Sequence, residues 1–237
     1  MNKLLHNSGI GLFMVCFVAG CGSGSSSSEN SSCINIKRPT VGLKYSSDSS
    51  DLTYPSNNVG LINRRVIELN VDTFNNVSKT QSGRSVASDG NTIAAISSES
   101  TFTILDDYMN ISYFKNSDQS GTVVNNYSPP QKQAIDRVCE NQTWNNSYDV
   151  TGSINTGNSV LPNNRSVASV HTIESINEAK TVTAGTFTTF KEMVEYGDST
   201  KIIWRDQNSG TVVFQETRNN LDEITGTQEL TSLSYGD

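Results

Sequence analysis

The sequence contains few residues suited to acid–base, nucleophilic or metal chemistry. Its two histidines are His6, in an N-terminal segment with the pattern of a removable signal peptide, and His171, in the alternating stretch 169–173. A Ser-His-acid triad would have to be built on His171, and sites that need two histidines are excluded within one mature chain. We expect His171 to lie on the surface or on an edge strand. No GxSxG, GxxxxGK(S/T) or GxGxxG motif argues otherwise.

The carboxylates do not form a predicted acid–base pair. Glu192 and Glu195 are three residues apart, so on a strand they face opposite ways and cannot share a site. Asp106-Asp107 is expected to close a strand. Asp48 and Asp51 form a DxxD pair in a Ser-rich stretch without the Gly and terminal Glu of an EF-hand. We therefore expect no catalytic residue, no metal and no cofactor.

Residues 1–20 are predicted to be a signal peptide. Residues 10–19 are apolar, but ten residues of helix rise about 15 Å, half of a hydrocarbon core of about 30 Å. The stretch ends in Val18-Ala19-Gly20-Cys21, which resembles the lipobox of bacterial lipoprotein signal peptides. The resemblance implies cleavage before Cys21 and acylation of this cysteine, with palmitate among the attached chains.

Residues 21–32 follow as a Ser/Gly-rich tether, which has no apolar surface to bury. Gly22 after the acylated cysteine resembles the pattern that sends Gram-negative lipoproteins to the outer membrane. We expect a lipid-anchored protein there, facing the periplasm or the exterior, with the membrane and an unidentified envelope protein as partners. The formal charge of −7 argues against a nucleic-acid partner, because phosphate binding needs clustered Lys and Arg.

The mature chain retains two of the four cysteines. Cys16 leaves with the signal peptide and Cys21 is acylated, so Cys33 and Cys139 remain. An even pair in an oxidising compartment predicts a disulfide between them. Two separate buried thiols are the alternative.

The composition favours a mainly β protein. Only 34% of the residues are apolar, below the roughly 45–50% (Gly included) of typical soluble domains. From Cys21 onward, Ile and Val number 32 against 9 Leu, and branching at Cβ favours strands. We predict one β-rich domain at 33–237, with antiparallel strands at 186–196, 201–205, 211–217 and 229–235.

Other segments break this pattern. A short helix is predicted near 131–140, because Pro129-Pro130 precedes it and apolar residues recur at helical spacing. Residues 45–58 have little apolar content and are predicted to be a loop. Residues 84–88 recur at 165–169 and residues 120–124 at 209–213, which predicts two related β units at about 60–128 and 148–235.

The C-terminal quarter resembles a known pattern. The run 182–191, then Trp204, then 210–212 is similar to one in uncharacterised bacterial exported proteins with a curved half-barrel sheet, like that of the periplasmic lipoprotein carriers. The resemblance implies a meander forming a curved sheet or half-barrel. Trp204 is expected to pack against neighbouring phenylalanines or, with them, to line a ligand cleft; Trp144 is either a recognition aromatic or a lid on the helix end. The predicted lining residues are Trp204, Phe187, Phe190 and Phe214.

Two functions follow from these features. The first is a non-enzymatic accessory or binding role at the envelope. The second is a carrier that holds an acyl chain or other apolar ligand, which requires an apolar cavity of several hundred Å³. A hydrolase with carboxylate chemistry ranks third.

Overall fold

The computed structural model describes residues 32–51, 63–87, 92–118 and 121–235, within the compact unit Ser31–Asp237. The predicted signal peptide, the tether up to residue 31 and Cys21 lie outside the described residues. The described residues form fifteen strands: β1 Cys33–Asn35, β2 Lys44–Asp51, β3 Asn63–Phe74, β4 Ser78–Ala87, β5 Thr92–Leu105, β6 Tyr108–Asp118, β7 Gly121–Ala134, β8 Arg137–Cys139, β9 Thr143–Asn155, β10 Val160–Pro162, β11 Arg165–Val182, β12 Gly185–Tyr196, β13 Ser199–Asp206, β14 Val212–Asn219 and β15 Ile224–Ser234.

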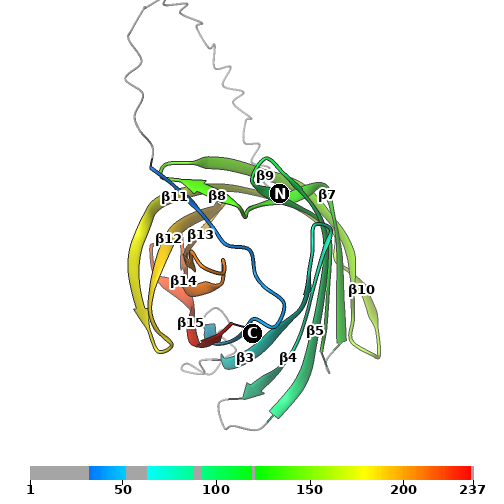
Figure 1. Cartoon of the computed structure of the whole chain (residues 1–237). Helices are drawn as coiled ribbons and strands as arrows, with labels where there is room; N and C mark the ends of the chain where they lie inside the picture. Colours follow the sequence, from blue (N-terminus) through cyan, green and yellow to red (C-terminus); the bar gives the residue numbers. More distant parts are fainter. Residues whose placement is uncertain (1–31, 52–62, 88–91, 119–120, 236–237) are drawn as a thin grey trace, which may run out of the picture. The chain divides into compact units, whose positions relative to one another are not determined.

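Twelve of these strands form a closed antiparallel barrel. Strands β2 to β7, β9 and β11 to β15 each pair with a neighbour on both sides, and the ring closes where β7 pairs with β9. Figure 1 shows the ring from one mouth. The prediction of a mainly β antiparallel fold is confirmed. A half-barrel was wrong, because the pairing of β15 with β2 and of β7 with β9 leaves no open side.

The barrel wall alternates between inward and outward side chains. Along β9, Trp144, Asn146 and Val150 are buried, whereas their neighbours Thr143 and Asn145 are exposed. The outward positions are mainly polar, and several inward positions are also polar. A modest number of apolar residues therefore suffices to fold the barrel, since a two-sided sheet needs only one apolar face.

The C-terminal meander is confirmed. Strands β12, β13, β14 and β15 overlap the four predicted segments to within one residue at Thr211 and at Tyr235, and they pair in sequence order. Asp106 and Asp107 close β5, as predicted, and both have positive φ in the turn to β6.

The predicted helix at 131–140 was wrong. Residues 131–134 end β7, and β8 follows after a break of two residues. Gln131 and Ala134 pair with β6, and Pro129-Pro130 falls where the β6–β7 register is interrupted. Ladder hydrogen bonds to β6 therefore outweigh the local helix signals. Described residues contain no helix at all, and so none that could cross a membrane.

The prediction of a loop at 45–58 was wrong for residues 45–51. Residues 45–51 belong to β2, which pairs with β15 and β3. Backbone hydrogen bonds from both neighbours hold this Ser-rich strand, whatever its side chains. Residues 52–58 lie outside the described residues.

The recurring segments fall on corresponding strands. Residues 84–87 lie on β4 and residues 165–169 on β11, while residues 121–124 begin β7 and residues 209–213 lead into β14. From the first recurring segment to the second, the chain passes through four consecutive strands of the ring in each case, β4 to β7 and β11 to β14. The duplication of a β unit stays a prediction.

A segment at residues 36–43, here called the crossing segment, runs over one mouth of the barrel (Figure 1). Before it, β1 pairs with β8, and a disulfide joins Cys33 to Cys139, the predicted pairing. Along it, the Ile36 amide donates to the carbonyl of Asp136 at 2.9 Å. Arg38 forms two hydrogen bonds of 2.6 Å to the Asp136 carboxylate. The segment is therefore held at its start by a covalent bond and an ion pair.

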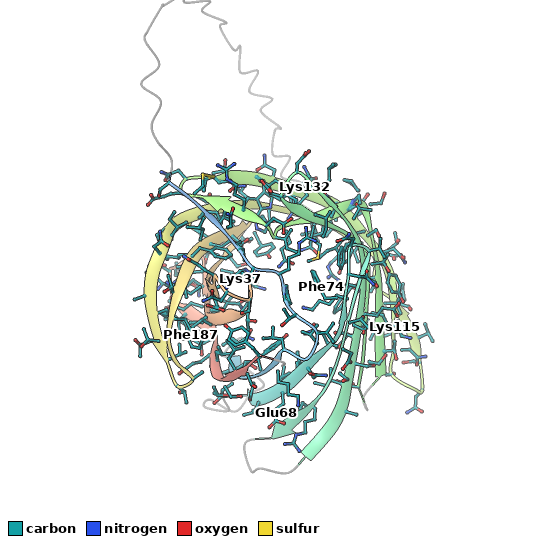
Figure 2. All side chains as sticks on the ribbon, viewed as in Figure 1. Lys37, Glu68, Phe74, Lys115, Lys132 and Phe187 are labelled. Atoms are coloured by element: carbon teal, nitrogen blue, oxygen red, sulfur yellow. A yellow bond between two sulfur atoms is a disulfide. The ribbon has the colours of Figure 1, made fainter. Side chains whose placement is uncertain are left out.

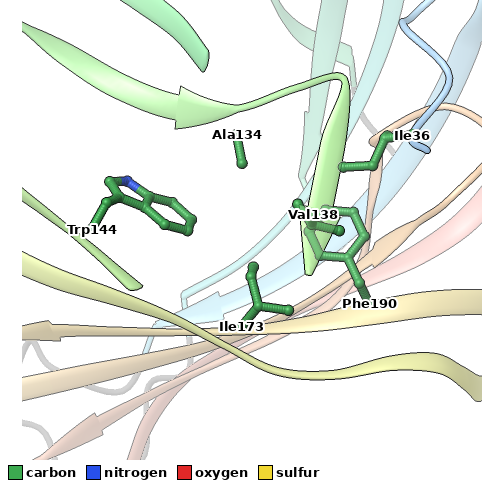
Figure 3. Close-up of a cluster of buried hydrophobic side chains, with 6 residues drawn as sticks. All are labelled: Ile36, Ala134, Val138, Trp144, Ile173 and Phe190. Carbon is green, nitrogen blue, oxygen red and sulfur yellow. The ribbon is translucent and has the colours of Figure 1, made fainter. Parts of the chain in front are cut away.

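Beneath the crossing segment, apolar side chains from five strands meet (Figure 3). The cluster combines Ile36 with residues of β7, β8, β9, β11 and β12, and it closes the interior on that side. Its members are Ile36, Ala134, Val138, Trp144, Ile173 and Phe190.

Replacing Asp136 by asparagine is expected to loosen the crossing segment without unfolding the barrel. A partly exposed bidentate pair contributes up to about 1 kcal/mol, so exchange of the Ile36 and Lys37 amides should accelerate about three- to fivefold. Hydrogen exchange read by mass spectrometry measures this. Asp222→Asn, which removes an exposed bond from Arg218, is the control and should leave those amides unchanged. Equal exchange in both variants would show that the ion pair does not hold the segment.

Candidate functional site

A buried hydrogen-bonded chain links three neighbouring strands inside the barrel. His171 of β11 and Glu192 of β12 are only 7% and 4% exposed. The Nδ1 atom of His171 lies 2.8 Å from Oε1 of Glu192, and Arg205 of β13 donates from Nε to Oε2 at 3.0 Å. The prediction that His171 lies at the surface was therefore wrong. The alternating sequence of residues 169–173 places His171 on the same face of the strand as Ser169 and Ile173. It does not tell whether that face points into the barrel.

The other side of the imidazole is also occupied. Asn146 binds the backbone of Lys132 through both its amide atoms, which fixes Nδ2 as the atom 3.0 Å from Nε2 of His171. Because an amide nitrogen can only donate, Nε2 accepts, and the ring proton lies on Nδ1 toward Glu192. Ser169 Oγ lies 3.1 Å from the same Nε2 atom.

Burial by itself raises the pKa of Glu192, but the charge of Arg205 and the hydrogen bond from His171 outweigh this effect. The pKa of this carboxyl group is therefore below its ordinary value, and Glu192 is ionised at neutral pH. Glu192 and Glu195 face opposite sides of β12, as their spacing predicted: Glu192 is buried and Glu195 is exposed.

Ser169, His171 and Glu192 have the connectivity of a hydrolase triad, with a serine on one imidazole nitrogen and a carboxylate on the other. Two features argue against catalysis. Asn146 competes for the nitrogen that would accept the serine proton. All three side chains are buried, and none lines the cavity described next. We interpret the chain as a polar network that aligns β11, β12 and β13.

Trp144 covers this network. Its ring stacks on His171 with centroids 4.8 Å apart and meets Tyr108 edge-on at 5.5 Å. Trp144 is buried in the cluster of Figure 3. It is neither an exposed recognition aromatic nor a lid on a helix end.

A cavity of about 170 Å³ lies between the crossing segment and the barrel wall. Figure 2 shows Lys37 and Phe74, two of its lining residues, near the middle of the mouth. One part of the lining is apolar and comes from the crossing segment and from several strands around the mouth. These apolar residues include Leu43, Val71, Phe74, Met109, Ile135 and Phe190.

The polar part of the cavity combines ionisable side chains with neutral amides and hydroxyls. Lys79 of β4, Arg205 of β13 and Tyr45 of β2 all line it. Burial, with a contribution from the charge of Arg205, lowers the pKa of Lys79 to about 8. Burial raises the pKa of Tyr45, which therefore stays protonated at neutral pH. Sequence patterns did not single out any of these three residues, because they are far apart in the chain.

The predicted ligand-lining aromatic residues separate into two groups. Trp204 lies on the opposite side of β13 from Arg205, outside the wall. Its ring lies 5.6 Å from that of Phe214, and the Lys180 ammonium is 3.9 Å from its centroid. The indole Nε1 donates to Glu178 at 2.9 Å, so Trp204 is a packing residue beneath the β11–β12 hairpin.

Phe190 lines the cavity, whereas Phe187, Phe214 and Trp204 are not among the described residues that line it. Phe187 pairs with Lys180 near the end of the β11–β12 hairpin. The described residues also contain no cluster of His, Cys, Asp or Glu able to hold a metal ion.

Fold and site together define a closed antiparallel barrel with an internal cavity. No family model matches the sequence, and no curated protein matches it. Similar solved structures include a Bacteroides fragilis protein with a YmcC-like fold, described as exported, at 11% identity and a TM-score of 0.43. A Parabacteroides distasonis protein described as a lipoprotein has 12% identity and a TM-score of 0.45. Both alignments cover 84% of this chain and 99% of the other. With TM-scores below 0.5, neither likeness assigns a function to this chain.

Proposed function

We propose that this protein is a lipid-anchored bacterial envelope protein with a non-enzymatic binding role. The observation that carries the binding role is the cavity under the crossing segment, where apolar walls meet hydrogen-bond donors. Small-molecule sites typically combine an apolar lining with a few convergent polar groups. The predicted lipid at Cys21 would hold the barrel at the outer membrane beside an envelope protein partner.

The size of the cavity favours a small ligand over an acyl chain. Sites for drug-sized ligands measure about 300–1,000 Å³, and this cavity has about 170 Å³. An acyl-chain carrier would need the crossing segment to move away, although a disulfide and an ion pair hold it. The carrier therefore ranks below a binder of small molecules.

Ligand-observed NMR on the mature protein tests the binding role. A set of compounds about the size of benzene, with neutral, cationic and anionic members, should contain binders. In the presence of the variant Val71→Trp, whose larger side chain fills the cavity, the NMR signals of these binders should match those of the free compounds. A set in which no member binds the wild-type protein would overturn the role.

Replacing Cys21 by alanine tests the anchor. Incorporation of labelled palmitate should be lost, and the protein should leave the membrane fraction, because stable anchoring needs the attached acyl chains. Cys16→Ala, which changes a cysteine inside the predicted signal peptide, should still incorporate palmitate and stay in the membrane fraction. Membrane retention of Cys21→Ala would contradict lipidation at this residue.

A further inference from the structure

Three side chains of the cavity, those of Tyr45, Lys79 and Arg205, keep donor hydrogens that no described residue accepts. Lys79 makes no ion pair and no hydrogen bond through its ammonium with any described residue. Arg205 uses Nε for Glu192, and its two terminal nitrogens have no acceptor among the described residues. Tyr45 accepts a hydrogen bond from Gln81 at 2.8 Å, which leaves its own hydroxyl hydrogen unused.

We propose that the cavity binds a small carboxylate whose apolar part is about the size of a benzene ring, with the carboxylate oxygens facing Lys79, Arg205 and Tyr45. This inference rests on the proposed binding role and assigns the chemical class of the ligand. Lys79 has no counterion among the described residues, and Arg205 keeps its two terminal nitrogens free beside its ion pair with Glu192. An uncompensated cation is costly inside a protein, so the site is suited to an anion. Arginine and lysine both bind carboxylates through charge-assisted hydrogen bonds.

The carboxylate of Glu192 does not neutralise the positive charge of the cavity or occupy all of its donors. It contacts Arg205 through one nitrogen and His171 through the other carboxylate oxygen. The ionisable groups that line the cavity are Lys37, Tyr45, Lys79 and Arg205, and no carboxylate is among them. The low pKa of Lys79, caused mainly by burial, agrees with a cation that lacks a counterion.

The apolar wall determines the rest of the ligand. Leu43 and Val71 are fully buried around the cavity, and Met109, Ile135 and Phe190 nearly so. A cavity of about 150 Å³ lined by apolar side chains accepts benzene. The cavity here is of similar size. Inorganic phosphate has no apolar part to bury against these walls and would keep much of its hydration.

Isothermal titration of the mature protein with four probes tests the class: benzoate, benzyl alcohol, benzylamine and inorganic phosphate. We expect benzoate to bind at least tenfold more tightly than benzyl alcohol, and benzylamine and phosphate not to bind measurably. Equal binding of benzyl alcohol or benzylamine, or tighter binding of phosphate, would overturn the carboxylate class. If none of the four binds, the binding role falls as well.

Lys79→Met is the matching variant. It should reduce benzoate affinity at least tenfold and leave benzyl alcohol affinity unchanged. The variant should fold, because it replaces a partly buried cation that has no counterion by an apolar side chain of similar length, and its melting temperature should rise. Lys115→Met, which removes a lysine from the outside of the wall (Figure 2), is the control and should bind benzoate like the wild type. Unchanged benzoate binding in Lys79→Met would overturn the assignment.

The pH profile separates Lys79 from the other lining groups. With a pKa of about 8 in the free protein, Lys79 loses its proton between pH 7 and pH 9, so wild-type benzoate affinity should fall about tenfold over this range. The affinity of Lys79→Met should be flat over the same range. A parallel fall in the variant would assign the titration to another group and count against Lys79 as the ligand for the carboxylate.

Discussion

Replacing Glu192 by alanine is expected to destabilise the barrel by about 3–5 kcal/mol. The change leaves the Arg205 cation and the Nδ1–H group of His171 in the interior without their acceptor. Removing one partner of a buried ion pair costs this much because the other charge stays desolvated. Urea denaturation followed by circular dichroism measures the loss.

Glu195→Ala is the matched control for this prediction. Glu195 lies three residues along β12 on the exposed outer face, so its removal should change the free energy of unfolding by less than about 0.5 kcal/mol. Similar effects of the two substitutions would show that the buried network does not stabilise the fold.

The lowered pKa of Glu192 adds a pH dependence with a defined sign. Its ionised form is favoured in the folded state, so the stabilisation is present above the ordinary carboxyl value of 4.5. It is lost as the pH falls through the lower folded-state pKa. Glu192→Gln should therefore show a flatter decline of stability in acid than the wild type.

The second large effect is expected from the double variant Cys33→Ala/Cys139→Ala. The bridge closes a loop with a sequence separation of 106, and removing such a native disulfide costs about 2–5 kcal/mol. The loss should also free the crossing segment, because β1 and β8 hold its start. Thermal unfolding with and without dithiothreitol measures both effects.

The reductant provides the internal control. Wild-type protein in dithiothreitol should match the double variant, and the double variant should not respond to it. Identical melting of reduced and oxidised wild-type protein would contradict a stabilising bridge.

Local patterns predicted the strands well where the meander is sequential. Residues 185–196 and 199–206 are rich in residues that favour strands and are joined by a short turn with positive φ at Gly197, so neighbouring strands pair through local contacts. The same reasoning failed at 131–139. There, Ala134 and Val138 are buried in one apolar cluster and Ile135 in another, so the helical spacing reflects two different packing environments.

The site was less accessible to sequence reasoning. Tyr45, Lys79 and Arg205 lie on β2, β4 and β13, and only closure of the ring brings them to one cavity. A lysine or arginine in an alternating strand is ordinarily an outward residue. The inward position of Lys79 follows from its pairing partner Phe74 and from a β-bulge that shifts the β3–β4 register between Val71 and Thr73.

The amino-acid sequence was sufficient for the mainly β character of the fold, and it predicted the Cys33–Cys139 pairing that the structure contains. Branching at Cβ and period-two alternation are local properties. Cys33 and Cys139 are the two cysteines left once Cys16 and Cys21 are assigned to the predicted signal peptide and lipobox, and two cysteines allow one intramolecular pairing. The closed barrel, the crossing segment and the donor-rich cavity arise from pairings between distant strands. Their energies depend on which face of each strand turns inward, and a shift of one residue in register reverses that face.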